Sequence, residues 1–229
     1  MSRPQTSEML KSQLTVAPRT VQSETVDKLR NAILMGQFKP GARLAEAMLC
    51  DAMNVSRTSI REALRRLEGE KLIVIVPNKG PSVAKIRWED VKAIYETRAL
   101  LEGEIAYRAA TEATPEDIRE MRRALRAFNS AIVKDDAAAR VATTSEFYDV
   151  MLKRCGNHII GEILQSLNAR INFLRFQSMS QPGRSKHSAV ELKTILDALE
   201  SGNATAAREA AVEHVKLACA AVRALYEAG

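Results

Sequence analysis

The segment VSRTSIREALRRLEGEKL, residues 55–72, restricts the fold more than any other part of this chain. Its apolar side chains recur at helical spacing and define one face that must be buried: Ile60, Leu64 and Leu67. Three arginines recur four residues apart on a flank beside that face: Arg57, Arg61 and Arg65. Ser56 is a favourable N-cap residue. The pattern predicts a helix from Ser56 to about Gly69 that packs by one side and presents positive charge on another.

Two shorter helices are expected before this segment. Apolar residues at helical spacing predict the first over residues 23–35, and Gly36 ends it. The same spacing predicts the second over residues 45–53. Asn54 suits the sharp turn that follows, because Asn tolerates a left-handed backbone. The second and third helices should therefore be joined by a tight turn.

Two β-rich runs follow the third helix, over residues 72–76 and 82–86, and PNKGP (77–81) joins them. This pattern predicts a two-stranded hairpin with Lys79 at its tip. Three short helices with a tight turn between the last two, followed by a hairpin, are typical of a winged helix-turn-helix domain. Such a domain places its third helix in the major groove of DNA.

The arginines of the third helix have a chemical role in this interpretation. Arg57 and Arg61 lie near its N-terminus, and arginine can donate two hydrogen bonds to guanine O6 and N7. Other side chains are expected to contact phosphates or bases: Thr58 and Ser59 on the helix, and Arg43 and Lys79 outside it. The alternative is a surface helix with an incidental arginine stripe. The preceding helix pair and the hairpin favour DNA.

The distribution of charge favours the same interpretation. The chain carries a formal net charge of +6, but the charge is not evenly spread. Residues 1–87 hold 15 Lys and Arg against 8 Asp and Glu, whereas residues 88–229 hold 19 against 20. A basic first third beside a near-neutral remainder indicates that the N-terminal part meets a polyanion.

The sequence does not indicate export or a membrane. The N-terminal residues lack the apolar core of a signal peptide, and no apolar run approaches the length that spans a bilayer. The three cysteines are odd in number and widely spaced, unlike a disulfide framework or a CxxC metal site. We therefore expect a cytoplasmic protein that does not contact a membrane.

From Trp88 onward the sequence is predicted to be helical throughout. One helix start is especially clear, because Thr114 is a capping residue, Pro115 occupies the first helical position and acidic residues follow. Short breaks separate the expected helices, which cover about 87–110, 114–132, 137–154, 157–178, 185–201 and 203–226. Helices with such short connections predict an α-helical bundle.

The fold class expected for the chain is thus mainly α, in three parts. Residues 1–20 are polar and lack periodicity, which predicts a flexible tail. Residues 21–87 should form the winged helix-turn-helix domain. Residues 88–229 should form an all-α bundle.

The first part of the chain resembles the DNA-binding domain of the GntR family of bacterial transcription regulators. The elements G…PG.RL.E..L, VSRT..REAL.RLE and P..G..V occur in order at the family's spacing, between about Val21 and Ile86. The resemblance implies an operator-binding dimer. It implies DNA contact for Arg43, Arg57, Thr58, Ser59, Arg61, Lys79 and Gly80. The family usually has Gly where Lys71 stands, and we expect this departure to leave DNA binding intact.

The second part resembles the FCD effector domain of the FadR subfamily. The resemblance covers about residues 90–220 and is carried by YETRALLEGEIAYRAA, FYDVMLKRCGN and ILDALESGNATAAREAAVEHV. It implies that the bundle forms a homodimer and binds a small-molecule effector. In metal-containing relatives the metal can hold a small carboxylate, so a carboxylate-bearing effector is expected here.

Many FCD domains bind a divalent metal, and this chain departs from their ligand pattern. The residues at the four ligand positions are Thr144, Tyr148, Leu192 and His214. Leu cannot coordinate a metal, and Thr and Tyr are poor ligands for Zn²⁺. One imidazole is too few for a site, so we expect no metal and no other cofactor. The alternative is that a neighbouring carboxylate substitutes: Glu146, Asp149 or Glu191.

Without a metal, side chains must hold the effector. The candidates are Arg98, Tyr148, Asn168, Arg175 and His214. Arg98 could grip a carboxylate or pair with Glu102 four residues on, and the sequence leaves both open. His214 could contact the ligand or be a hydrogen-bonded core histidine, which is the commoner case. Leu192 makes the site more apolar, so an acyl chain, or a filled pocket in a bundle that only dimerises, also stays open.

These interpretations give one leading function and two alternatives. We expect a DNA-binding transcription regulator, a repressor by the family's usual outcome, whose affinity for its double-stranded operator is modulated by the effector. The first alternative is an architectural DNA-binding dimer without an effector. The second is an enzyme, which is disfavoured because no Ser-His-Asp or Cys-His arrangement and no phosphate-binding glycine loop is recognisable.

Overall fold

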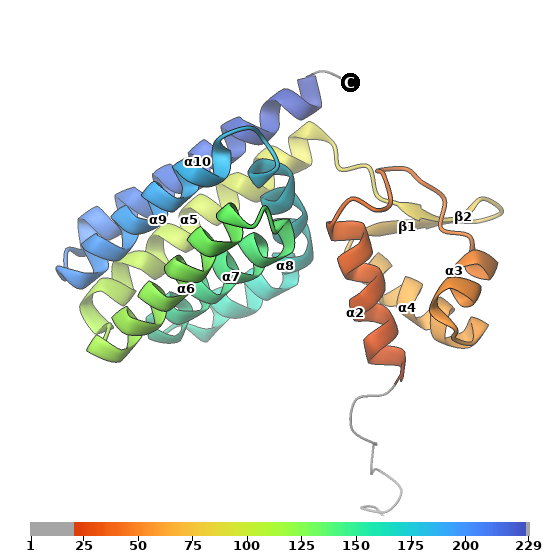
Figure 1. Cartoon of the computed structure of the whole chain (residues 1–229), viewed down its shortest axis with the longest axis horizontal. Helices are drawn as coiled ribbons and strands as arrows, with labels where there is room; N and C mark the ends of the chain where they lie inside the picture. Colours follow the sequence, from red (N-terminus) through yellow and green to blue (C-terminus); the bar gives the residue numbers. More distant parts are fainter. Residues whose placement is uncertain (1–20, 228–229) are drawn as a thin grey trace, which may run out of the picture.

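A computed structural model describes residues 21–227 and places two helical parts side by side (Figure 1). A small part with a hairpin is built from the first third of the chain, and a bundle of long helices is built from the rest. The mainly α fold expected from the sequence is confirmed. The expected tail over residues 1–20 lies outside the described residues.

The small part contains the expected helices in the expected order. These are α2 (Val21–Leu34), α3 (Glu46–Met53) and α4 (Arg57–Gly69). Ser56 caps α4, because its side chain accepts a hydrogen bond from the Ser59 amide. Asn54 ends α3 in the left-handed conformation, with φ of 51°, which turns the chain sharply into α4. The buried face of α4 consists of Ile60, Ala63, Leu64 and Leu67.

The hairpin forms, but its second strand begins earlier than the sequence suggested. Strands β1 (Ile73–Val76) and β2 (Gly80–Val83) pair antiparallel, so the turn is shorter than the predicted one. Two left-handed residues make the short turn possible: Asn78 with φ of 63° and Gly80 with φ of 80°. Pro81 was expected in the turn but lies within β2, where its carbonyl accepts a hydrogen bond from the Leu44 amide.

Lys71 has a left-handed backbone, with φ of 60°. It lies between the end of α4 and the start of β1, and its amide donates to the carbonyl of Glu68. Glycine adopts this conformation without steric cost, which explains a glycine preference at such a turn. Lys71 keeps the turn geometry and adds an exposed positive charge.

The bundle contains the expected long helices with short connections (Figure 1). They are α5 (Trp88–Glu112), α6 (Pro115–Val133), α7 (Ala137–Arg154), α8 (His158–Met179), α9 (Arg184–Glu200) and α10 (Ala204–Glu227). Thr114 caps α6, as predicted, and the structure adds a reciprocal capping box between Thr114 and Asp117. Within residues 21–227, every helix is too short or too polar to span a lipid bilayer.

Helices α5 and α10 approach each other closely. A methyl group added at Gly103 of α5 would lie 2.7 Å from Cγ2 of Val212 on α10. Val212 is β-branched and therefore cannot easily rotate out of the way. Gly103 thus fixes how near the two helices can lie.

Helix α8 also contacts the small part. Phe173 is buried on α8 and lines a narrow hollow together with residues of α2 and the hairpin, including Ile33, Leu72 and Val83. In Figure 1, α8 is the bundle helix that lies beside α2. The bundle and the small part therefore share apolar contacts through α8.

Replacing Gly103 with Ala should destabilise the protein, although Ala favours helix. The added methyl group should overpack the α5–α10 contact, at a cost of about 1–3 kcal/mol before about 1 kcal/mol of helix propensity is regained. Gly69→Ala is the matched control, because no atom lies within 4 Å of a methyl group there. Urea denaturation of both variants measures the difference. If Gly103→Ala proved as stable as Gly69→Ala, the close approach of α5 and α10 would be contradicted.

Candidate DNA-binding surface and effector pocket

The N-terminal end of α4 presents the side chains that the sequence singled out. Arg57, Thr58 and Arg61 are exposed there, and Ser59 is partly exposed. The Arg61 Nε donates to Oε2 of Glu46 on α3 at 2.9 Å, which orients Arg61 from the neighbouring helix. Arg61 is exposed and Glu46 is partly exposed, so the pair is weak and can open when a stronger anion arrives.

The hairpin brings a second group of cations to the same part. Arg43 forms an isolated β-bridge with Ser82, so its backbone is attached to β2. Its guanidinium lies beside Gly80, where an added methyl group would be 4.0 Å from Nη2. Lys79 stands exposed at the turn. Among residues 21–227, Arg43, Arg57 and Lys79 have no ion-pair partner, so their charges are available to a polyanion.

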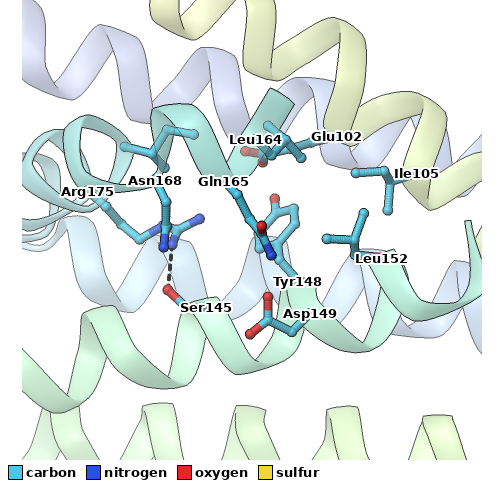
Figure 2. A pocket seen from close by; sticks show the side chains of 11 residues that line it. Glu102, Ile105, Ser145, Tyr148, Asp149, Leu152, Leu164, Gln165, Asn168 and Arg175 are labelled. Carbon is cyan, nitrogen blue, oxygen red and sulfur yellow. Dashed lines mark hydrogen bonds between the residues drawn. The ribbon is translucent and has the colours of Figure 1, made fainter. Parts of the chain in front are cut away.

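A cleft of about 230 Å³ lies in the bundle between α5, α7 and α8 (Figure 2). Three of the five sequence-predicted effector residues line it: Tyr148, Asn168 and Arg175. The other lining residues are Glu102, Ile105, Ser145, Asp149, Leu152, Leu164, Gln165 and Ile171. Arg98 and His214 do not line the cleft, but each lies next to a residue that does.

Arg175 is the unusual charge in this cleft. Arg175 is only 6% exposed. Its Nη1 donates to Ser145 Oγ at 3.0 Å and to Asn172 Oδ1 at 3.1 Å. Within the described chain, no carboxylate lies within ion-pair distance of it, and Nε is buried without an acceptor. Burial lowers the pKa of Arg175, and the nearby positive charge of Arg98 lowers it further.

Tyr148 adds a second unsatisfied group. The Arg175 guanidinium lies 5.5 Å from the centre of the Tyr148 ring, in a cation–π contact. The Tyr148 hydroxyl is buried and makes no hydrogen bond to any described residue. Burial raises the pKa of Tyr148 well above its usual range, so the hydroxyl stays protonated and can donate.

Arg98 adopts the intrahelical alternative that the sequence had left open. Its Nε donates to Oε1 of Glu102 at 2.8 Å, and the two residues are 1% and 2% exposed. Burial alone would lower the pKa of Arg98 and raise that of Glu102, but their mutual attraction reverses both shifts. The pair is therefore charged. Arg98 does not line the cleft and affects it only by holding the carboxylate of Glu102, which does.

His214 belongs to a separate hydrogen-bonded chain. Its Nδ1 lies 2.7 Å from Oε2 of Glu191, and Arg184 donates to both oxygens of that carboxylate at 2.9 and 2.8 Å. Because a carboxylate can only accept, Nδ1 carries the proton. Burial lowers the pKa of His214, so its imidazole is neutral at pH 7. The Tyr148 ring is its neighbour on the cleft side, at 6.2 Å between centroids.

Several lining residues escaped the sequence reasoning. Ser145 and Leu152 lie three and four residues from Tyr148, and Gln165 lies three residues from Asn168. Residues three or four apart share a helix face, so the candidates already chosen could have identified them. Asp149 was considered only as a substitute metal ligand.

Comparison with known proteins identifies both parts. Residues 21–83 match the gntR family of bacterial regulatory proteins, and residues 93–217, more than half of the chain, match the FCD domain. The chain belongs to the GntR family of transcription regulators with an FCD domain. It is a DNA-binding transcription regulator, and its relatives are regulators rather than enzymes.

Three relatives of this GntR-family protein illustrate the match. The regulator YdhC of Bacillus subtilis is 26% identical over 204 residues, which cover 89% of this chain and 91% of YdhC. The transcriptional repressor RspR of Escherichia coli is 24% identical over 195 residues, 85% of this chain and 86% of RspR. The structure of Escherichia coli McbR/YncC has the same fold, with a TM-score of 0.78 at 22% identity, over 91% of this chain and 100% of McbR.

The residues at the metal-ligand positions of the FCD domain do not fit a metal. The Thr144 hydroxyl donates to the carbonyl of Arg140 at 2.8 Å, and Leu192 offers no donor. His214 is committed to Glu191, which is itself held by Arg184. No three His, Cys, Asp or Glu side chains gather for a metal anywhere in residues 21–227.

Replacing Arg57 with Ala should weaken operator binding by about 1–3 kcal/mol and relax the base preference at one position, because arginine reads guanine with paired hydrogen bonds. Arg61→Ala should do the same.

Lys79→Ala should weaken binding to all DNA sequences alike, because phosphate contacts carry no sequence information. It should also reduce the slope of log affinity against log salt concentration by about one. Selection from a random duplex library followed by salt titration measures both effects.

The control for these variants is Arg119→Ala, which removes an exposed, paired arginine on α6, far from the small part. It should leave DNA affinity unchanged. Unaltered affinity and base preference in both the Arg57 and Arg61 variants would show that α4 does not read the major groove.

Lowering the pH should destabilise the bundle through His214. Because burial lowers the pKa of His214 below its ordinary value of 6.5, the unfolded chain binds a proton at pH values where the folded chain does not. The free energy of unfolding should be at its full value above pH 6.5 and should decrease as the pH falls below it. Glu191 contributes to this loss of stability only at lower pH, because its pKa is lowered from the ordinary value of 4.5. Burial alone would raise the pKa of Glu191, but its interactions with His214 and Arg184 outweigh burial.

Chemical denaturation from about pH 7 to about pH 5 measures this dependence. His214→Gln should flatten it, whereas His187→Gln, which changes an exposed histidine, should retain it. The same loss of stability in both variants would mean that His214 is not its source.

Proposed function

We propose that this GntR-family protein is a homodimeric repressor whose operator affinity is set by a small, carboxylate-bearing effector in the cleft between α5, α7 and α8. The observation that carries the effector proposal is Arg175, a buried guanidinium that lines the cleft without an acidic partner. A buried charge is costly unless it is paired. A bound carboxylate would supply the missing partner, with two hydrogen bonds available from one guanidinium.

The DNA-binding roles follow from the surface of the small part. Arg57 and Arg61 are proposed to read bases in the major groove from the start of α4. Thr58 and Ser59 extend this contact along the helix. Phosphate contacts are proposed for Arg43 and Lys79, while Gly80 lets the hairpin approach the backbone of the DNA closely.

Two further features of the proposal concern assembly and location. A dimer would present two α4 helices to a symmetric operator, so that the half-site spacing reflects the separation of the two DNA-binding parts. The name of the relative RspR, a transcriptional repressor, supports repression as the outcome. Because a bacterial transcription regulator acts on DNA in the cytoplasm, the protein would act there.

The size of the cleft limits the effector. Its volume of about 230 Å³ corresponds to about eight water molecules at the density of the liquid. This lies below the range of about 300–1,000 Å³ that is usual for drug-sized ligands. A small acid fits within such a cleft. The roles proposed for Tyr148 and Asn168 are direct contacts, and those for Arg98 and His214 are indirect, through Glu102 and the Tyr148 ring.

Helix α8 offers a route from the cleft to DNA. Arg175 lines the cleft, and Phe173, two residues earlier, is buried against the small part beside Ile33, Leu72 and Val83. A carboxylate that pulls on Arg175 would shift α8, and Phe173 would transmit the shift to α2 and the hairpin. The effector changes operator affinity only to the extent that it binds the two arrangements with different affinity.

A panel of small carboxylates tests this proposal by thermal unfolding and operator binding. At least one acid should raise the melting temperature of the wild type by mass action and change its operator affinity. Arg175→Gln should keep dimerisation and operator binding but bind that acid about 10–100-fold more weakly, since a hydrogen-bonded charge contributes about 1.5–3 kcal/mol.

The matched control is Arg140→Gln, which removes another buried arginine of the bundle that does not line the cleft. It should respond to the acid like the wild type. Absence of any thermal response across the panel, with operator binding intact, would instead indicate an architectural dimer without an effector.

A further inference from the structure

The cleft changes in character from one end to the other. Figure 2 shows Arg175, Asn168 and Ser145 gathered at one end and the aliphatic side chains of Ile105 and Leu152 at the other. The first group offers a cation, an amide and a hydroxyl, whereas the second offers only apolar surface. A ligand that fits both ends has an anionic head and a short aliphatic tail.

Asp149 stands between these two ends. Figure 2 shows its carboxylate below the Tyr148 ring, between Ser145 and Leu152. The residue is exposed at the mouth of the cleft, and its carboxylate makes no hydrogen bond or ion pair with any residue in the described range 21–227. The cleft thus holds one cation and one anion that form no ion pair with each other, although the charge of Arg175 partly offsets the rise that burial causes in the pKa of Asp149.

The other charged groups near the cleft are already compensated. The carboxylate of Glu102 lines it but is paired with Arg98, and the ammonium group of Lys153, on the same helix as Asp149, pairs with Glu120. Neither pair is available to balance a ligand. A ligand that pairs with both remaining charges therefore carries a negative group at Arg175 and a positive group at Asp149.

Asp149 makes a simple carboxylate a poor ligand. An acid bound at Arg175 brings a second negative charge into the same small cleft, and like charges repel over such distances. A positive group on the ligand removes this repulsion and pairs with Asp149. The protonated Tyr148 hydroxyl and the Gln165 amide, between the two ends, can satisfy the second carboxylate oxygen.

We propose that the effector is a small zwitterionic amino acid with an aliphatic side chain. Its carboxylate binds Arg175, its ammonium group binds Asp149, and its side chain lies against Ile105 and Leu152. This inference rests on the effector pocket proposed above and specifies the ligand class of that pocket. The cleft volume of about 230 Å³ suits an amino acid of this size.

Calorimetric titration of the full-length protein with matched compounds tests the inference. The probes are leucine, its deaminated analogue 4-methylpentanoate, its hydroxy analogue 2-hydroxy-4-methylpentanoate, and 3-methylbutylamine, which lacks the carboxylate; valine and isoleucine are run with their own deaminated acids. The amino acids should bind about tenfold more tightly than the deaminated and hydroxy acids, a difference of about 1.4 kcal/mol. The amine alone should not bind measurably.

Two variants test whether the ammonium group of the ligand binds at Asp149. Asp149→Asn should abolish the preference for the amino acid over its deaminated analogue without abolishing binding of the latter. Glu146→Gln is the control, because Glu146 is an exposed carboxylate of α7 that does not line the cleft. It should leave the preference unchanged.

The outcomes separate this inference from the proposed function. If the deaminated acids, or other carboxylates, bind as tightly as the amino acids and lose affinity in Arg175→Gln, the carboxylate site stands and the amino-acid inference is wrong. If no acid binds, or if Arg175→Gln binds all of them like the wild type, the effector proposal itself fails and the inference falls with it.

Discussion

Buried charge must be neutralised, and the bundle meets this requirement for all but one of its buried arginines. Within the described residues, Arg98 pairs with Glu102, Arg140 with Asp135 and Arg184 with Glu191. Arg175 has only a hydroxyl and an amide oxygen as partners, inside a cleft open to solvent. The paired arginines are neutralised by acids of the chain, whereas Arg175 can be neutralised only by an anion from outside it. The proposed function depends on that difference.

The departure from the metal pattern of FCD domains has a structural counterpart. His214, which stands at a ligand position, is held instead by Glu191, and Glu191 is held by Arg184. This chain of hydrogen bonds connects α9 to α10, as a metal shared between helices would do. In the function that we propose, the guanidinium of Arg175 takes on the recognition of an anion.

Much of the fold and part of the site could be predicted because their causes are local. Helical spacing placed α4, Ser56 and Thr114 act through adjacent amides, and the small part was recognisable from its motif. The second strand was misplaced, because the left-handed Asn78 and Gly80 allow a shorter turn than the prolines suggested. Pro81 tolerates the strand because only its carbonyl is needed there.

The sequence by itself determined the order of elements, the family and the cationic surface of the small part, since spacing and side-chain chemistry are sufficient for these. Only the tertiary structure decided which charges are already paired. The sequence offered Arg98 a partner four residues on, Glu102, but left open whether the two pair; in the structure they do, whereas Arg175 meets no acid in the described chain. Whether Arg175 meets an acid depends on which side chains the neighbouring helices bring to it, and this is set by contacts between residues far apart in the sequence.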